Sequence, residues 1–204
     1  MEIHDPIETN SPVICDMSST IASRPIDVNK YDLIFAGAQK NLGIAGVTIV
    51  IVKNKLLSGV NTELLPMFDY SAHANEASML NTSPVFSWYV SGLVFDWIHE
   101  QGGVEEMARI NKLKSDLLYD YIDQSEFYNN PVSKPYRSWM NIPFTLFRDS
   151  LDDKFIKSAE ELGLLNLKGH RTVGGMRASV YNAMPIEGIK RLISFMDEFA
   201  KLHE

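Results

Sequence analysis

Lys40 stands in unusual surroundings for a charged residue. It lies within AGAQKNLGIAG, residues 36–46, a mostly small and apolar stretch between two β-rich runs. A lysine held in such a place can be desolvated, which favours the neutral amine that a Schiff base requires. We therefore interpret Lys40 as a candidate covalent catalyst, with small neighbours that let a flat ligand approach closely. The alternative is an exposed loop lysine, which is the commonest kind.

Asp16 is a second candidate, at the end of the apolar run PVICD. An acid in that position is often only a turn former or a helix N-cap. In the functional interpretation it is a buried carboxylate that pairs with a protonated ring nitrogen and so maintains an electron sink. Asp16 and Lys40 each lie beside the end of an expected strand, so the two side chains could converge on one site.

A third candidate is a cluster of cationic side chains near the C-terminus. His170, Arg171 and Arg177 surround three glycines in LKGHRTVGGMRASVYNAMP, residues 167–185. Arginine binds carboxylates and phosphates through two parallel hydrogen bonds, so the cluster suits an anionic ligand. The alternative is a basic turn followed by a strand.

The segment NTSP, residues 81–84, precedes a long apolar run. Asn81 or Thr82 could cap a helix there, with Pro84 near the first turn. Backbone N–H groups and hydroxyls at the same place could also bind a phosphate.

No other chemistry competes strongly with these candidates. The five histidines have no metal-ligand spacing and Cys15 is the single cysteine, so no metal site is expected. The chain also lacks the GxxxxGK[ST], GxSxG and GxGxxG motifs.

The composition predicts a soluble globular protein. The chain has 204 residues, of which 45% are hydrophobic and 22% charged, and a formal net charge of -7. Without a basic block, that charge argues against a nucleic-acid partner but not against small anionic substrates. No apolar run approaches the length of a membrane span, the N-terminus does not resemble a signal peptide, and the single cysteine fits a reducing compartment. These features favour a cytoplasmic protein without a membrane partner.

The elements that would position the candidates follow an α/β pattern. Apolar or β-branched runs predict strands in PVICD, DLIFAG and GVTIVIVKN, which places the polar candidates near strand ends, where open sheets bind ligands. Residues 54–83 form a long stretch that we expect to be irregular. Residues 85–101 are apolar nearly all round, which predicts a buried helix.

The rest of the chain predicts a second, smaller α+β domain. A helix follows Gly103, with one apolar stripe composed of Val104, Met107, Ile110, Leu113, Leu117 and Ile122. Beyond it the expected elements are a strand in WMNIPFTLF, a helix in DDKFIKSAEELG, a strand in GGMRASVY and a helix in IEGIKRLISFMDEFAKL.

Three long strings carry a resemblance to a known family. They are DMSSTIASRPIDVNKYDLIFAGAQKNLGIAGVTIVIV, HANEASMLNTSPVFSWYVSGLVFDWI and LKGHRTVGGMRASVYNAMPIEGI. They resemble the phosphoserine aminotransferases, class-V aminotransferases of fold type I that use pyridoxal 5'-phosphate. The resemblance runs from about Pro12 to the C-terminus. It implies that residues 1–103 are the C-terminal part of a large cofactor-binding domain with a mostly parallel sheet, and that residues 104–204 are a small α+β domain.

The resemblance also implies roles for the residues that bind the cofactor. By position, Lys40 matches the lysine that bonds covalently to the cofactor, Gln39 matches a contact to the cofactor phosphate, and Asp16 matches the carboxylate facing the pyridine nitrogen. Asn81 and Thr82 match a pair that reaches the cofactor phosphate of the other subunit. This implies a homodimer with shared active sites.

The implied substrates are small anions. His170 and Arg171 match residues that bind the substrate's phosphate or side-chain carboxylate, and Arg177 matches the arginine that binds the α-carboxylate. The implied reaction transfers an amino group from glutamate to 3-phosphohydroxypyruvate, giving 2-oxoglutarate and phosphoserine for serine biosynthesis. Members of this family have a substantial region before the matched part, so we expect the chain to be a truncated form.

Two alternatives to this function follow. The chain could be a non-catalytic fragment that forms a dimer. It could also belong to another lyase that uses pyridoxal phosphate on the same fold, although GHR, residues 169–171, provides for a second anionic group on the substrate and disfavours that alternative.

Overall fold

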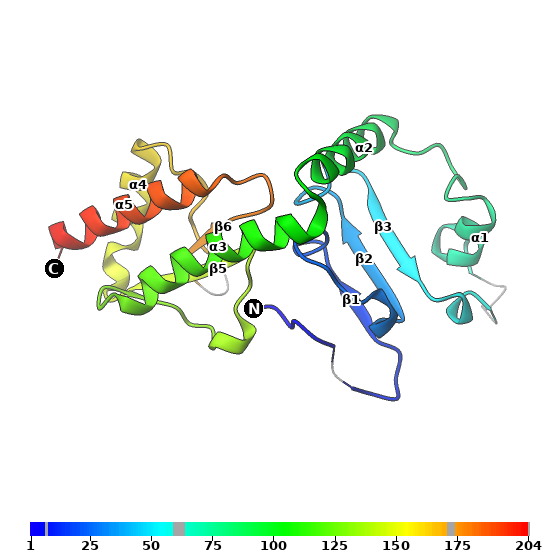
Figure 1. Cartoon of the computed structure of the whole chain (residues 1–204), viewed down its shortest axis with the longest axis horizontal. Coiled ribbons are helices and arrows are strands. Elements are labelled where there is room, and N and C mark those ends of the chain that lie inside the picture. The colour runs from blue at the N-terminus through cyan, green and yellow to red at the C-terminus, as the bar shows by residue number, and fades with distance from the viewer. Residues whose placement is uncertain (7, 59–63, 171–173, 204) are drawn as a thin grey trace. The chain divides into compact units, whose positions relative to one another are not determined.

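The computed structural model describes residues 1–6, 8–58, 64–170 and 174–203. The chain divides into two compact units, one formed by residues 5–103 and the other by residues 1–4 together with residues 104–204. Figure 1 shows a separate sheet in each unit, and each sheet has three strands. Each unit also has its own cluster of buried apolar side chains.

The sheet of the first unit has the strand order β1-β2-β3. Its strands are β1 (Ile14–Asp16), β2 (Leu33–Gly37) and β3 (Thr48–Val52), as the sequence predicts. β1 and β2 are parallel, but β2 and β3 are antiparallel. The expected mostly parallel sheet is therefore found only in the first pair. The reason is that the connection from β2 to β3 is too short for the crossover that a parallel pair needs.

The segment between β3 and the apolar helix is more regular than expected. It contains a short helix, α1 (Tyr70–Asn75), and two single turns of 3₁₀ helix at Asn54–Leu56 and Pro66–Phe68. The carboxylate of Asp69 caps α1, because it accepts a hydrogen bond of 2.8 Å from the backbone N–H of Ser71.

The apolar helix forms as predicted, as α2 (Val85–Glu100), but it is not buried within its unit. Its buried residues are Ser87, Ser91 and Ile98, whereas Phe86 is 70% exposed and Trp88 is 67% exposed. The expectation of a buried helix is thus wrong for the described chain. The helix buries two serines and Ile98 in its own unit and leaves most of its large apolar side chains exposed.

The second unit has the α+β order that the sequence predicts. Its elements are α3 (Gly103–Gln124), β4 (Tyr128–Asn129), β5 (Asn141–Leu146), α4 (Asp152–Glu161), β6 (Met176–Ser179) and α5 (Ile186–His203). The strands form an antiparallel sheet in the order β4-β5-β6, of which the two-residue β4 was not predicted. The core between sheet and helices is rich in aromatic side chains, notably Phe127, Tyr128, Phe144, Phe155, Phe195 and Phe199.

The buried face of α3 differs from the predicted stripe. Leu113 is 48% exposed, while the neighbouring Lys114 is fully buried. The buried residues of this helix are Met107, Asn111, Lys114, Ser115, Leu118, Tyr119 and Ile122, which again follow helical spacing but include polar groups. The helix is therefore rotated relative to the stripe that hydrophobicity alone favours.

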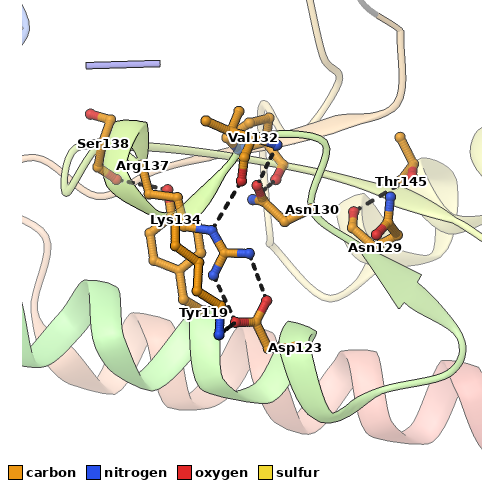
Figure 2. A network of polar contacts seen from close by, with 10 residues as sticks. Tyr119, Asp123, Asn129, Asn130, Val132, Lys134, Arg137, Ser138 and Thr145 are labelled. Carbon is orange, nitrogen blue, oxygen red and sulfur yellow. Dashed lines mark hydrogen bonds and ion pairs between the residues drawn. The ribbon is translucent and has the colours of Figure 1, made fainter. Parts of the chain in front are cut away.

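Arg137 attaches the connection between β4 and β5 to α3 (Figure 2). Its guanidinium donates two hydrogen bonds of 2.8 and 2.7 Å to the carboxylate of Asp123, and its Nε donates to the carbonyl of Val132 at 3.2 Å. The same guanidinium lies 4.7 Å from the ring centre of Tyr119, whose hydroxyl donates to the Ser138 carbonyl at 2.9 Å. This paired arrangement fixes the chain that leads into β5.

Candidate active site

Asp16 and the loop of Lys40 lie at the same edge of the first sheet. Asp16 ends β1, and β2 ends at Gly37, just before the segment 38–47 that we call the lysine loop. Because β1 and β2 are parallel, their carboxyl ends meet at one edge, where α/β sheets bind ligands. The backbone N–H of Gly37 donates to Ser18 Oγ at 3.0 Å, which ties the two strand ends together.

Asp16 carries an ionised carboxylate beside a positive charge. Its Oδ1 accepts a hydrogen bond of 2.8 Å from the backbone N–H of Ser18. Hydrogen bonds from the Ser18 side chain and backbone lower the pKa of Asp16, and the charge of Lys40 lowers it further. Asp16 and Lys40 are thus within electrostatic reach of each other.

Both side chains are exposed in the described chain, which differs from the sequence expectation. The carboxylate of Asp16 was expected to be buried, and Lys40 to be desolvated between the strands. Ala36 of β2 and Ala38 of the lysine loop are buried, but the side chains of Gln39 and Lys40 are exposed. Desolvation of the amine therefore requires a ligand or further protein surface over this edge.

The lysine loop is held in place by backbone and side-chain hydrogen bonds. The buried side chain of Asn41 donates to the carbonyls of Ile21 and Ser19 at 3.1 and 3.3 Å. The Ala38 N–H donates to the Val47 carbonyl at 2.9 Å. Lys40 is therefore an exposed side chain on a well-anchored backbone, which suits a group that must be positioned for chemistry.

The glycines of the lysine loop serve helix packing. A Cβ atom on Gly43 would lie 2.8 Å from Ser91 Oγ, and one on Gly46 would lie 2.7 Å from Ser87 Oγ. The Ser87 hydroxyl also donates to the Ala45 carbonyl at 2.8 Å. The missing side chains of Gly43 and Gly46 therefore make room for α2, whereas the expectation that small residues beside Lys40 admit a flat ligand stays a prediction.

Asn81 and Thr82 lie just before α2 and are exposed. The N-cap of α2 is Pro84, and no side-chain hydrogen bond caps the helix, so the expected capping by Asn81 or Thr82 is not observed. The Asn81 amide instead donates to the Thr82 carbonyl at 3.0 Å. Among the described hydrogen bonds, none joins this pair to Asp16 or Lys40.

Arg177 lies on β6 in the second unit, opposite Pro143 of β5. Its backbone N–H donates to the Leu167 carbonyl at 2.7 Å, so the main chain is fixed on both sides. Its Nε is buried and has no hydrogen-bond partner among the described residues. A buried guanidinium nitrogen without an acceptor is unusual, and a carboxylate ligand would supply that acceptor.

His170 lies on the turn that leads into β6. The Gly169 N–H donates to the Gly175 carbonyl and the Gly174 N–H donates to the His170 carbonyl, both at 2.8 Å. A Cβ on Gly169 would lie 2.1 Å from the Gly174 carbonyl oxygen, so this close approach of two backbone segments requires glycine at position 169. His170 itself is exposed, and Arg171 lies outside the described residues.

The predicted site residues thus fall into two groups. Asp16, Gln39, Lys40, Asn81 and Thr82 belong to the unit of residues 5–103, and His170 and Arg177 belong to the other unit. Four residues that hold this site in place were not among the predicted site residues, namely Ser18, Asn41, Ser87 and Ser91. Ser18 had a recognisable signal, because a residue two positions after an aspartate commonly donates its backbone N–H to that carboxylate.

The described residues contain no group of three or more histidine, cysteine, aspartate or glutamate side chains arranged to hold a metal ion. None of the helices described here has the length and apolar character needed to cross a membrane.

Residues 4–192 match the model of the aminotransferase class-V family, and the chain belongs to this family. It is 54% identical over 194 residues to a phosphoserine aminotransferase of Acinetobacter baumannii, a match that covers 95% of this chain and 54% of the relative. It is 55% identical to that of Hahella chejuensis, over 94% of this chain and 53% of the relative. The chain therefore spans about half the length of the curated relatives that it matches.

Solved structures give the same α/β fold. The phosphoserine aminotransferase of Bacillus circulans subsp. alkalophilus superposes with a TM-score of 0.92 at 45% identity, over 96% of this chain and 55% of that one. A pyridoxal-phosphate-bound phosphoserine aminotransferase of Trichomonas vaginalis gives 0.89 at 37% identity, over 96% and 56% of the two chains.

Proposed function

We propose that this protein is part of a pyridoxal-phosphate-dependent aminotransferase that makes phosphoserine and 2-oxoglutarate from 3-phosphohydroxypyruvate and glutamate. The observation that carries the proposal is the placement of Asp16 and the lysine loop at the same carboxyl edge of a parallel strand pair. The similarity to phosphoserine aminotransferases over 95% of this chain supports the choice of substrates.

The residues of this edge fit the cofactor. Pyridoxal phosphate needs an amine for covalent attachment and an anion beside its pyridine nitrogen. Lys40 supplies an exposed amine on an anchored loop, and Asp16 supplies a carboxylate whose pKa is lowered by hydrogen bonds from Ser18. Gln39, next to Lys40, would contact the cofactor phosphate.

When bound, the cofactor supplies an electron sink for the electrons left by loss of a proton from the substrate α-carbon. Asp16 would hold a proton on the pyridine nitrogen, because an ionised carboxylate stabilises the positive charge there. The Lys40 amine would remove the proton from the substrate α-carbon and later return a proton, acting first as general base and then as general acid.

The second unit would bind the substrate's anionic groups. The buried Nε of Arg177, which has no partner among the described residues, would donate to the α-carboxylate. His170 and Arg171 would bind the second anionic group, the phosphate of phosphohydroxypyruvate or the side-chain carboxylate of glutamate. The same donors serve both groups because both are negatively charged acceptors.

The active protein would be a homodimer that includes more polypeptide than this chain. The outward side of α2 supports this proposal, because Trp88 is 67% and Leu93 50% exposed beside a cavity of about 500 Å³ that they line with Val47 and Ile49. Large apolar faces of this kind usually contact other protein. Asn81 and Thr82, just before this helix, would contact the cofactor phosphate held by the partner subunit.

The test is to add pyridoxal phosphate to the protein, reduce the adduct with borohydride and locate the modified lysine by peptide mass mapping. Modification at Lys40 and its loss in Lys40→Ala are expected, whereas Lys30→Ala, an exposed lysine of the same unit, should keep it. Scattered labelling of surface lysines that survives in Lys40→Ala would contradict the proposal. Formation of 2-oxoglutarate from glutamate, dependent on added phosphohydroxypyruvate, then distinguishes a transaminase from a lyase and from an inactive fragment.

A further inference from the structure

Lys114 is a fully buried lysine that the proposed chemistry does not use. It lies in the middle of α3 with 0% of its surface exposed. Its Nζ donates hydrogen bonds to the carbonyl oxygens of Val180, Tyr181 and Met184, at 3.2, 2.9 and 2.9 Å. An ammonium group has three N–H donors and no acceptor, so the three carbonyls match it completely.

The three carbonyls belong to one turn, residues 180–184, which follows β6 directly. β6 ends at Ser179 and carries Arg177. Two further hydrogen bonds hold the same turn: the Asn111 side chain donates to Asn182 Oδ1 at 2.8 Å, and the Tyr181 hydroxyl donates to Asn141 Oδ1 at 3.1 Å. The turn is thus tied to α3 on one side and to β5 on the other.

A buried cation at this position is not needed for packing. Taking an ammonium out of water is costly, and apolar residues of similar size often replace buried ions without loss of stability. The geometry here is specific, because a single side chain donates to three carbonyls of one turn, of which the Tyr181 carbonyl also accepts from the Met184 N–H at 2.9 Å. Such an arrangement is typical of a group that selects one backbone conformation.

Arg177 is the functional group that this backbone conformation would control. The turn begins one residue after the end of its strand, and the Val180 N–H donates to the Met140 carbonyl at 2.9 Å, which continues the register of β6 on β5. If the turn moved, the end of β6 would move with it. The Arg177 Nε is buried and without a described partner, so even a small displacement would misalign it with a carboxylate.

We propose that the Lys114 ammonium acts as an internal cation that fixes residues 180–184 and thereby positions Arg177 for the substrate's α-carboxylate. The described hydrogen bonds support the role of Lys114 in fixing this turn, and its link to substrate rests on the function proposed above. Lys114 is a positioning residue, because it acts through the backbone that carries Arg177.

The test compares Lys114→Met and Lys114→Ala with the control Lys112→Met, whose lysine is exposed on the same helix and pairs with Asp116. Hydrogen exchange of the backbone amides is measured on the chain without cofactor, and L-glutamate binding on the chain loaded with pyridoxal phosphate. In both Lys114 variants, amide exchange in residues 177–184 should rise about tenfold or more relative to α5. The affinity for L-glutamate should fall about tenfold.

Chemical rescue separates the ammonium from mere packing. Propylammonium should restore both readouts in Lys114→Ala, because it returns a donor cation to the carbonyls, whereas propanol should not. If a variant folds only with added propylammonium, that result also supports the proposal. If Lys114→Ala does not fold with propylammonium or with propanol, the proposal is overturned.

Three other outcomes also overturn the proposal. They are exchange that rises equally across α5 and β5, rescue by propanol as good as by propylammonium, and faster exchange with unchanged glutamate affinity. If the wild-type chain does not bind L-glutamate, this chain does not by itself form the proposed substrate site and the link to substrate is overturned, while the exchange data alone decide whether Lys114 fixes the turn.

Discussion

Gly46 of the lysine loop packs closely against Ser87 of α2. A Cβ on Gly46 would lie 2.7 Å from Ser87 Oγ and 3.3 Å from Ser87 Cβ, and Gly46 has a φ of +122° that side-chain-bearing residues rarely adopt. The adjacent Ser87 hydroxyl donates to the Ala45 carbonyl. The position of Lys40 on the sheet edge therefore depends on a helix that contributes no catalytic group.

Gly46→Ala should destabilise the protein by about 1–3 kcal/mol, because it adds both a steric clash and backbone strain. Urea unfolding followed by circular dichroism measures the effect. Gly92→Ala is the matched control, because it lies in α2 with nothing within 4 Å of a new Cβ and should be neutral or slightly stabilising. The double variant Gly46→Ala with Ser87→Gly should recover part of the loss, and no recovery would remove Ser87 as the source of the clash.

Ser18→Ala should raise the pKa of Asp16 toward its ordinary value. The largest cause of the lowered pKa is the hydrogen bond from the Ser18 side chain, which the substitution removes while the bond from the Ser18 N–H remains. Carbon-13 NMR of the side-chain carboxyl group during a pH titration measures the change. Ser19→Ala serves as the control, and an Asp16 titration that stays unmoved in Ser18→Ala would contradict the assignment.

Asp32 should make the stability of the protein sensitive to acid. A hydrogen bond from Lys55, together with one from the Val13 N–H and with Lys53, holds the pKa of Asp32 well below its usual range. The Asp32 carboxylate therefore binds a proton more tightly in the unfolded state than in the folded state. Its contribution to the free energy of unfolding is complete above the ordinary pKa of aspartate, and it is lost as the pH falls from that value to the lowered pKa of the folded state.

Urea unfolding of Asp32→Asn at several values between about pH 7 and about pH 3 measures this contribution. The variant should be less stable than the wild type at neutral pH, and the difference should shrink in acid. Asp96→Asn, at an exposed aspartate of α2, should keep the acid dependence of the wild type. A difference in the free energy of unfolding between Asp32→Asn and wild type that grows in acid would contradict this prediction.

Lys114 should make the stability of the protein depend on pH in the alkaline range. Burial lowers the pKa of Lys114 from 10.5 to about 8, so the folded protein releases this proton while the unfolded chain still holds it. The free energy of unfolding should therefore rise with pH between about 8 and 10.5, by at most about 1.4 kcal/mol per pH unit. Unfolding experiments that compare wild type with Lys114→Met over this range measure it, and a flat difference would show that the amine does not titrate there.

The apolar side of α2 should support self-association. Trp88 is 67% exposed in the described chain, and Trp88→Lys should weaken a dimer at least about tenfold if this face is covered by the partner. Sedimentation equilibrium gives the dissociation constant. Leu165→Lys changes an apolar residue that is 64% exposed in the other unit and should leave association unaltered. Equal association of wild type and Trp88→Lys would exclude Trp88 from the interface.

Local sequence patterns predicted most of the elements correctly. Apolar and β-branched runs indicated β1, β2 and β3, an all-round apolar run indicated α2, and an apolar stripe at helical spacing indicated α3, because such patterns depend on near neighbours in the chain. The class of the fold and the family follow from the same sequence. The roles of Lys40, Asp16 and Arg177 stay predictions, although Asp16 and the lysine loop lie at the same edge of the sheet.

Only the tertiary structure decided which faces those elements bury. The hydrophobic stripe of α3 pointed to Leu113, yet Lys114 is the buried neighbour, because carbonyls of a turn far along the chain accept its three hydrogen bonds. Likewise, serines of α2 occupy the space left by the missing side chains of Gly43 and Gly46. A sequence pattern gives the period of an element, whereas the burial of a polar or small residue depends on partners that folding brings from elsewhere in the chain.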